Sequence, residues 1–201
     1  MNIRAVIFDF GGVLVRTEDQ AFRRALAARL DMTSEELGAL IFESNSARQA
    51  ILGEITTQEH WDFVRKILKL SEEEFPSVPL AFWGGDILDT ALMDYIRSLH
   101  PQYKTALLSN AWDDLRGKLR QTWKIDDAFD EIIISSEVGF AKPDLRIYRL
   151  TLDRLRVNPD EAVFIDDFQE NVDGAILAGL QAIRFESSHQ VLKALSRLLM
   201  S

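Results

Sequence analysis

Cysteine is absent from this 201-residue sequence, and no apolar run approaches the roughly 20 residues that a membrane-spanning helix needs. Without cysteine the chain forms no disulfide and carries no thiol nucleophile, a composition that fits a reducing compartment. The first apolar run is interrupted by Asp9, which argues against a secretory signal peptide. We therefore expect a cytoplasmic protein with no membrane partner.

Basic residues are also scarce relative to acidic ones: 23 Lys and Arg stand against 32 Asp and Glu, a formal net charge of −9. Nucleic-acid backbones are bound by clusters of Lys and Arg, so we expect no nucleic-acid partner. A phosphorylated substrate would have to meet local positive features, such as a metal ion, a lysine or backbone amides. The length and the 47% apolar content suit one core with a modest insertion, and nothing in the sequence indicates the oligomeric state.

The first of four short apolar runs ends in a carboxylate. Residues 4–12 read R-A-V-I-F-D-F-G-G, so Asp9 closes the run, and Gly11 and Gly12 follow. A run this short, bounded by glycine, is typical of a strand buried on both faces of a parallel sheet. The glycines let backbone amides approach a ligand closely. Taken alone, Asp9 is either a reactive group at the mouth of the strand or a cap for the following turn.

Three later apolar runs also end in polar residues. The ends are Ser109-Asn110 after 105–108, Ser135-Ser136 after 132–134 with Lys142 a short loop later, and Asp166-Asp167 after 162–165. Helix-like segments separate these runs, so the strands should be parallel and joined by right-handed crossovers. The carboxyl ends of such strands share one edge of the sheet, where ligands bind. We therefore predict an α/β fold with a Rossmann-like parallel sheet that gathers these side chains at one place.

The region between the first strand and the remaining strands has a helical pattern. Thr33 with Glu36 and Thr56 with Glu59 form capping boxes, and no convincing strand lies between residues 18 and 86. This pattern predicts a block of helices inserted into the sheet domain.

We place the boundaries of this arrangement as follows: an α/β core of residues 1–15 and 87–201, and a helical cap domain of residues 16–86. Residues 78–85 should break the helical pattern and return the chain to the core. Asp86 should then cap a helix that runs to His100. The insertion is either a lid over the active site or a helical subdomain without a gating role.

The order of the motifs resembles the haloacid dehalogenase superfamily of hydrolases. Asp9, Ser109, Lys142 and the pair Asp166-Asp167 match its four motifs in order, each near a predicted strand end. The stretches T-A-L-L-S-N-A-W-D-D, S-E-V-G-F-A-K-P-D-L-R-I-Y and V-F-I-D-D-F-Q-E-N are similar to the phosphatase domain of mammalian soluble epoxide hydrolase and to bacterial sugar-phosphate phosphatases. The resemblance covers nearly the whole chain and implies a hydrolase with a helical cap over its active site.

This resemblance implies a Mg²⁺-dependent phosphatase that acts on a small phosphorylated metabolite. Asp9 would attack phosphorus and form an aspartyl-phosphate that water hydrolyses. Asp9, the backbone carbonyl of Gly11 and the pair Asp166-Asp167 would hold the metal, with Asp167 as the direct ligand and Asp166 beside it. Ligands of oxygen alone suit Mg²⁺. Read in isolation, the Asp pair would also suit the N-cap of a helix.

The phosphate itself would be bound by residues of the other motifs. Ser109 would offer its hydroxyl, and Asn110 and Gly12 their backbone amides. Lys142 would act as a point charge that neutralises both Asp9 and the phosphate, although a lone Lys before Pro is more often a solvated loop residue. These assignments come from the resemblance.

One position departs from the family pattern. Most phosphatases of this superfamily carry a second Asp two residues after the nucleophile, which protonates the leaving oxygen, and Gly11 stands there instead. A general acid is worth roughly 10²–10⁴-fold in rate. Either the leaving group is a good one (an anomeric, acyl or anhydride phosphate) or another acid substitutes, with Glu18 and Asp19 as candidates. Some sugar-1-phosphate phosphatases that the chain resembles also have Gly here, which favours a sugar 1-phosphate.

Two other functions remain as alternatives. Dehalogenases of 2-haloacids also lack this Asp, because halide needs no protonation, but they require no metal, whereas Asp166-Asp167 is typical of a metal site. A non-catalytic binding or regulatory protein that kept the fold is the second alternative. Trp112, three residues past Ser109, either lines a substrate pocket or packs in a core. We expect Asp113 to start the following helix.

Overall fold

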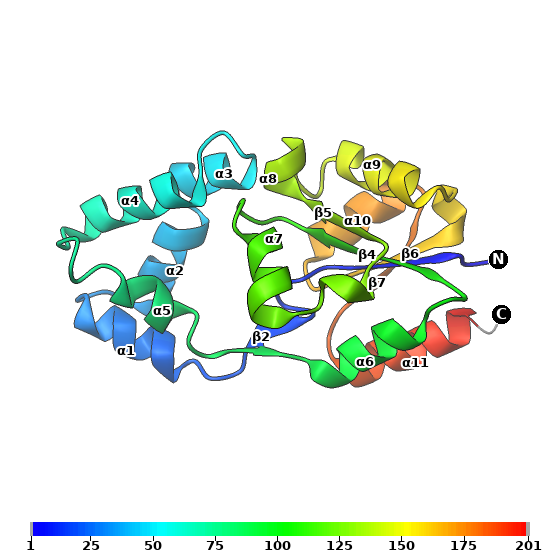
Figure 1. Ribbon diagram of the computed structural model, residues 1–201, viewed down its shortest axis with the longest axis horizontal. Coiled ribbons are helices and arrows are strands. Elements are labelled where there is room, and N and C mark those ends of the chain that lie inside the picture. Colours follow the sequence, from blue (N-terminus) through cyan, green and yellow to red (C-terminus); the bar gives the residue numbers. More distant parts are fainter. Residues whose placement is uncertain (1, 200–201) are drawn as a thin grey trace.

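The computed structural model describes residues 2–199, and its centre is a five-stranded parallel sheet in the order β5-β4-β1-β6-β7 (Figure 1). The five strands are β1 (Ala5–Phe8), β4 (Lys104–Ser109), β5 (Glu131–Ile134), β6 (Ala162–Asp166) and β7 (Gln181–Arg184). All four residues of β1 are buried, and Phe8 lies opposite Leu107 on one side and Ile165 on the other. The predicted α/β class and parallel sheet are confirmed, and β1 lies in the middle of that sheet.

Helices cover both faces of the sheet (Figure 1). One face carries α6 (Thr90–Ser98) and α11 (Ser188–Leu199), and the other carries α9 (Leu145–Leu155) and α10 (Gln169–Leu177). Successive side chains of a strand point to opposite faces. Accordingly, Val6 and Phe8 pack in the first cluster, and Ala5 and Ile7 pack in the second. The short elements α7 (Leu115–Lys118), a π-helical turn (Leu119–Trp123), α8 (Ser135–Val138) and two 3₁₀ turns (Asp126–Ala128 and Pro159–Glu161) complete the connections.

The insertion forms a separate block of helices to one side of the sheet, on the left in Figure 1. Its helices are α1 (Ala21–Arg29), α2 (Ser34–Phe42), α3 (Asn45–Ile51), α4 (Thr57–Leu68) and α5 (Ser77–Phe82). They share an apolar cluster of their own, with Leu37, Ile41 and Val64 fully buried at its centre. Both predicted capping boxes are present, at the N-termini of α2 and α4.

A two-stranded antiparallel ribbon joins this block to the sheet. The sequence of residues 13–17 is compatible with a short extended segment that leads away from the sheet, but its pairing with residues 86–88 was not predicted. The ribbon consists of β2 (Val15–Thr17) and β3 (Asp86–Leu88). Asp86 was expected to cap the next helix, but it lies in β3 and accepts hydrogen bonds from Thr17 and Arg23. The cap of α6 is Asp89 instead. Strands of three residues are too short to show a period of two, so pattern analysis has nothing to detect.

The expected break at residues 78–85 is also wrong in part, because α5 continues as far as Phe82. Pro79 is the third residue of this helix, in the first turn, where a missing amide proton removes no intrahelical bond. The ribbon straddles both proposed domain boundaries, which stay a prediction. Within residues 2–199, no helix is both long enough and apolar enough to cross a membrane.

Candidate active site

The end of β1 places a buried carboxylate at the edge of the sheet. The amide of Asp9 donates to the carbonyl of Ile165 at 2.9 Å, and the residue is only 6% exposed. Gly12 has a φ of +82°, and a Cβ atom there would lie 2.3 Å from Oδ2 of Asp167. Position 12 therefore requires glycine, because its φ is positive and because Asp167 lies where a Cβ atom would be. In contrast, a Cβ atom on Gly11 would meet nothing within 4 Å.

Lys142 is buried between two carboxylates. Its ammonium lies 2.8 Å from Oδ1 of Asp9 and 2.6 Å from Oδ2 of Asp166, and its side chain is 1% exposed. The side chain of Asn110 holds the backbone of Lys142 from both sides: Nδ2 donates to its carbonyl at 2.9 Å, and Oδ1 accepts from its amide at 2.8 Å. Lys142 is thus not a solvated loop residue, and the end of β4 fixes the loop that carries it.

The two aspartates at the end of β6 have different surroundings. Asp166 is fully buried and accepts hydrogen bonds from Lys142, from the amide of Phe168 and from the side chain of Asn171. Among the described residues, Oδ1 of Asp167 is buried and has no hydrogen-bond partner. Side-chain oxygens of Asp9, Asp166 and Asp167 all lie within 4.8 Å of one another. The N-cap position of α10 is Phe168, so the Asp pair does not occupy it.

The charges of this cluster do not balance, since three carboxylates meet one ammonium. Burial raises the pKa of Asp9 to about 7, although the neighbouring Lys142 opposes the rise. Burial by itself would lower the pKa of Lys142, but Asp9 and Asp166 raise it overall, so the ammonium keeps its charge. Burial and the adjacent Asp166 raise the pKa of Asp167. A surplus of negative charge, a buried oxygen without a partner and a donor set of oxygen alone fit a divalent cation such as Mg²⁺.

Other predicted residues lie outside this cluster of direct contacts. Ser109 ends β4 and is 3% exposed, at the same edge of the sheet. Glu18 forms an ion pair with Arg16 at 3.7 Å, and Asp19 accepts a hydrogen bond from the amide of Ala21. Neither contact connects these acids to Asp9.

Trp112 and Asp113 join the sheet domain to the helical insertion. Trp112 is buried in the aromatic cluster of the insertion, with its ring centroid 4.6 Å from that of His60, so the packing interpretation is correct. Asp113 was expected at the start of a helix. Its Oδ1 instead accepts from the amide and the hydroxyl of Thr57, at 3.0 and 2.5 Å, and α7 begins after Asp114.

Sequence analysis assigned no role to Asn171, which contacts both oxygens of Asp166 at 3.0 Å. The spacing carried a signal: Asn171 stands five residues after Asp166, in the first turn of α10, so its side chain returns toward the strand end. Asn can donate two hydrogen bonds to a carboxylate, and that property distinguishes it from the exposed polar residues around it.

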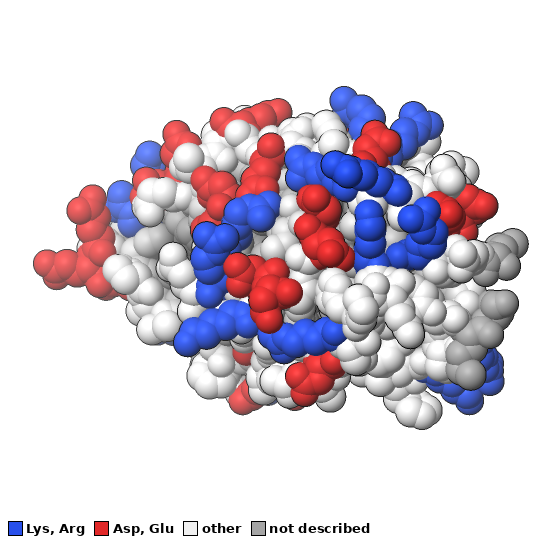
Figure 2. All heavy atoms as spheres, turned by 45° about the vertical axis from the view of Figure 1, so that its right-hand side comes forward, with Lys and Arg blue, Asp and Glu red and all other residues white. Residues whose placement is uncertain are grey.

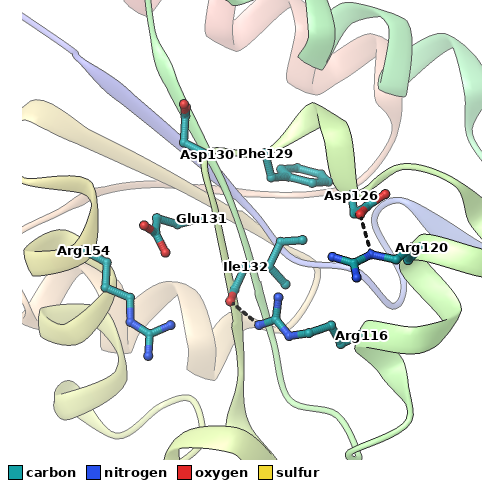
Figure 3. A pocket seen from close by; sticks show the side chains of 8 residues that line it. All are labelled: Arg116, Arg120, Asp126, Phe129, Asp130, Glu131, Ile132 and Arg154. Atoms are coloured by element: carbon teal, nitrogen blue, oxygen red, sulfur yellow. Dashed lines mark hydrogen bonds and ion pairs between the residues drawn. The ribbon is translucent and has the colours of Figure 1, made fainter.

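Two hollows lie near the insertion and along the edge strand. A groove of about 690 Å³ separates the start of α4 and α5 from the segment 113–118, and Trp61, Trp83 and Lys118 are among its lining residues. A smaller hollow of about 300 Å³ lies beside β5 (Figure 3). Its charged lining residues are Arg116, Arg120, Arg154, Asp126, Asp130 and Glu131. The opposite charges there balance, with Arg120 paired to Asp126.

A family model described as haloacid dehalogenase-like hydrolase matches residues 3–179. The chain belongs to this family. As a member of this family, it is a hydrolase.

Among curated proteins, the bifunctional epoxide hydrolase 2 of Sus scrofa is 28% identical over 219 aligned positions, which cover 98% of this chain and 39% of that protein. The chain thus spans well under half the length of this relative. The (S)-2-haloacid dehalogenase 1 of Pseudomonas sp. (strain CBS-3) is 27% identical, over 90% of this chain and 84% of the dehalogenase.

Among solved structures, a haloacid-dehalogenase-family enzyme from Bacteroides thetaiotaomicron in complex with magnesium and inorganic phosphate has a TM-score of 0.78 at 22% identity. The superposition covers 94% of this chain and 99% of that enzyme. It shows that the two proteins share the fold.

Proposed function

We propose that the protein is a Mg²⁺-dependent phosphatase that hydrolyses a small phosphomonoester through an aspartyl-phosphate on Asp9. The observation that carries this proposal is the buried, unpartnered Oδ1 of Asp167 beside Asp9 and Asp166. A buried carboxylate oxygen is unfavourable unless a cation or a donor meets it. The relative from Bacteroides thetaiotaomicron, solved with magnesium and phosphate, supports the same chemistry.

In this proposal, Asp9, the backbone carbonyl of Gly11 and Asp167 hold the metal, while Asp166 stays beside it as the partner of Lys142. The contacts of Asp166 support this division, because Lys142, Phe168 and Asn171 already occupy its two oxygens. When bound, the metal supplies positive charge that offsets the repulsion between a carboxylate and a phosphate.

The remaining residues bind and orient the phosphate. Lys142 neutralises Asp9 and the incoming phosphate, and the Ser109 hydroxyl with the backbone amides of Asn110 and Gly12 contacts the oxygens that are not transferred. A carboxylate oxygen of Asp9 forms a bond to phosphorus as the bond to the leaving oxygen breaks and that oxygen takes the electron pair. Water then hydrolyses the acyl phosphate, which releases inorganic phosphate and restores Asp9.

The leaving group is the part of the substrate that Gly11 helps to define. Without a carboxyl at this position, an acidic leaving group departs more readily than an ordinary alcohol, so we propose a sugar 1-phosphate as the substrate class. The isomers glucose 1-phosphate and glucose 6-phosphate test this, because the leaving group is an anomeric hydroxyl in the first and a less acidic primary alcohol in the second. Faster turnover of the 6-phosphate would contradict it.

We also propose that residues 16–86 act as a cap over this site. The hydrogen bonds from Thr57 to Asp113 and the burial of Trp112 among the helices of the insertion support a cap that is held against the sheet domain.

The absence of cysteine supports a cytoplasmic location.

Dehalogenation of a 2-haloacid is the second candidate, and the match to the Pseudomonas dehalogenase over most of both chains favours it. In that reaction the Asp9 carboxylate would displace halide from carbon, and no metal would be needed. The three-carboxylate cluster argues against dehalogenation, because displacement of halide by Asp9 needs no metal and therefore does not need the buried, unpartnered carboxylate of Asp167.

One experiment separates these functions. The purified protein is given p-nitrophenyl phosphate or 2-chloropropionate, each with Mg²⁺ or with EDTA, and Asp9→Asn serves as the control. We expect phosphate release that requires Mg²⁺ and falls to background in Asp9→Asn. Halide release in EDTA would establish the dehalogenase instead, and no turnover of either substrate would indicate a non-catalytic protein.

A further inference from the structure

Asp166 is the most fully bonded carboxylate at the active site. It is fully buried, and Oδ1 accepts from the amide of Phe168 at 2.8 Å, while Oδ2 lies 2.6 Å from the ammonium of Lys142. The side-chain amide of Asn171 donates to both oxygens at 3.0 Å. Within residues 2–199, Lys142 and Asn171 are the two side chains that donate hydrogen bonds to this carboxylate, and Asn171 contacts both of its oxygens.

The backbone of Asn171 is hydrogen-bonded to a residue of α9, the neighbouring helix on the same face of the sheet. Its backbone carbonyl accepts from the hydroxyl of Tyr148 at 2.7 Å, and Tyr148 is fully buried in α9 against the ring of Phe164. Gly174 allows this approach: a Cβ atom there would lie 3.0 Å from the Tyr148 hydroxyl and 2.9 Å from Pro143. Burial raises the pKa of Tyr148, so the phenol stays protonated and remains a donor.

These contacts form a connected chain that runs from a helix packed on the sheet to the nucleophile. Tyr148 holds Asn171, Asn171 holds Asp166, Asp166 holds Lys142, and Lys142 contacts Asp9. We propose that Asn171, supported by Tyr148, is a positioning residue. It orients the Asp166 carboxylate so that the Lys142 ammonium is directed at Asp9 and at the phosphate. The inference rests on the proposed function, because the role of Lys142 belongs to that proposal.

This role makes a prediction that a purely structural role does not make. Asn171→Ala removes two of the four hydrogen bonds to the Asp166 carboxylate and leaves those from Phe168 and Lys142. The carboxylate and the Lys142 ammonium are then held less rigidly, while the metal-holding oxygens of Asp9 and Asp167 are untouched. The value of kcat should therefore fall by roughly 10–100-fold, whereas stabilisation of the folded protein by Mg²⁺ should persist. In a Lys142→Ala background, the added change of Asn171→Ala should lower kcat by less than about threefold, because both variants then lack the same positioned charge.

A second, milder variant keeps the test decisive if Asn171→Ala folds poorly. Tyr148→Phe removes one hydroxyl and leaves the ring in place, and Thr151→Val is its matched control. Thr151 is also a buried hydroxyl on α9, but it bonds only within its own helix, to the carbonyl of Ile147. We expect Tyr148→Phe to lower kcat severalfold and Thr151→Val to leave it unchanged. Equal effects of both variants would overturn the role of Tyr148.

A crystallographic measurement distinguishes failure of this inference from failure of the proposed function. In crystals of Asn171→Ala, the Lys142 ammonium should have left its position 2.8 Å from Asp9. If Asp166 and Lys142 stay where they are, the positioning role is wrong even if the wild type is a phosphatase. If they move but the wild type cleaves no phosphate ester, the proposed function is wrong and the positioning contact stands.

Discussion

At the scale of single residues, burial controls the protonation of Asp9. Its pKa is raised from 3.8 to about 7 in the folded, metal-free protein, so between these values the folded state binds a proton that the unfolded state releases. The sign follows from linkage: this stabilising contribution is complete below pH 3.8 and is lost as the pH rises through 7. The metal-free protein thus becomes less stable, through Asp9, as the solution approaches neutrality.

This effect is measurable by urea unfolding in EDTA at pH 5, 6 and 7. Relative to Asp9→Asn, the wild type should lose free energy of unfolding with rising pH, by at most about 1.4 kcal/mol per pH unit. The comparison isolates Asp9, since other titrating groups are common to both proteins. Parallel pH profiles for the two proteins would show that Asp9 does not bind the proton.

Gly11 is the residue whose substitution most directly tests leaving-group protonation. Its φ does not fall among the positive values found at Gly12, Gly53, Gly139 and Gly179, and a Cβ atom there meets nothing within 4 Å. Gly11→Asp should therefore fold with a change in unfolding free energy within about 0.5 kcal/mol. Gly12→Ala is the matched contrast, since its Cβ would collide with Asp167.

The expected kinetic effect is on substrates with poor leaving groups. Wild type should cleave alkyl phosphates roughly 10²–10⁴-fold more slowly than aryl phosphates, and Gly11→Asp should narrow that gap by supplying a proton donor. Rates across a series of aryl and alkyl phosphates measure it. If the folded variant keeps the full gap, or if wild type shows none, proton supply at position 11 is not what limits the reaction.

At the scale of elements, the strands and helices that could be predicted are those marked in the sequence by an apolar run that ends at a carboxylate or by the residues of a capping box. The strand before Asp9 and the strand before Asp166 are apolar runs that stop at a carboxylate, and the capping boxes of α2 and α4 are marked by Thr and Glu three apart. The pairing of β2 with β3 could not be predicted, because a strand of three residues is too short to show the alternation of apolar and polar residues. The contacts of Trp112 and Asp113 depend on how the insertion folds back, which local sequence does not encode.

The hydrogen bonds between Asp113 and the start of α4 connect two elements, and their contribution to stability can be tested. Asp113 accepts hydrogen bonds from Thr57 at the first turn of α4, where a negative charge also meets the positive end of the helix. Asp113→Ala should therefore destabilise the protein by about 0.5–2 kcal/mol, as the loss of a helix cap does. Urea unfolding at neutral pH measures this loss.

The neighbouring residue offers the control. Asp114 pairs with Lys118 on a half-exposed surface, and such ion pairs contribute roughly 0–1 kcal/mol. Asp114→Ala should thus change stability much less than Asp113→Ala. Equal losses would mean that the charge of the segment, and not the link to α4, determines the effect.

At the scale of the whole molecule, the acidic surplus of the sequence is distributed in two ways. On the face that Figure 2 shows, Asp and Glu alternate with Lys and Arg, so the surface charges are largely interspersed. At the edge of the sheet, three carboxylates are concentrated and buried around one lysine. The net charge of the chain could be read from the sequence, but this concentration required the parallel topology, which brings the ends of β1, β4 and β6 to one edge.

This concentration links metal binding to global stability. A ligand that binds only the folded state adds RT ln(1 + [L]/Kd), about 2.7 kcal/mol at 100 times Kd, which for a chain of this size corresponds to roughly 5–10 °C in Tm. Saturating Mg²⁺ should produce such a shift in the wild type, and Asp167→Ala should abolish it. Lys142→Ala should keep the shift or enlarge it, because it removes a positive charge from the cluster without removing an oxygen ligand. Thermal unfolding of the three proteins with and without Mg²⁺ measures the shift in Tm independently of turnover. Equal loss of the shift in both variants would show that the roles of Asp167 and Lys142 are assigned wrongly.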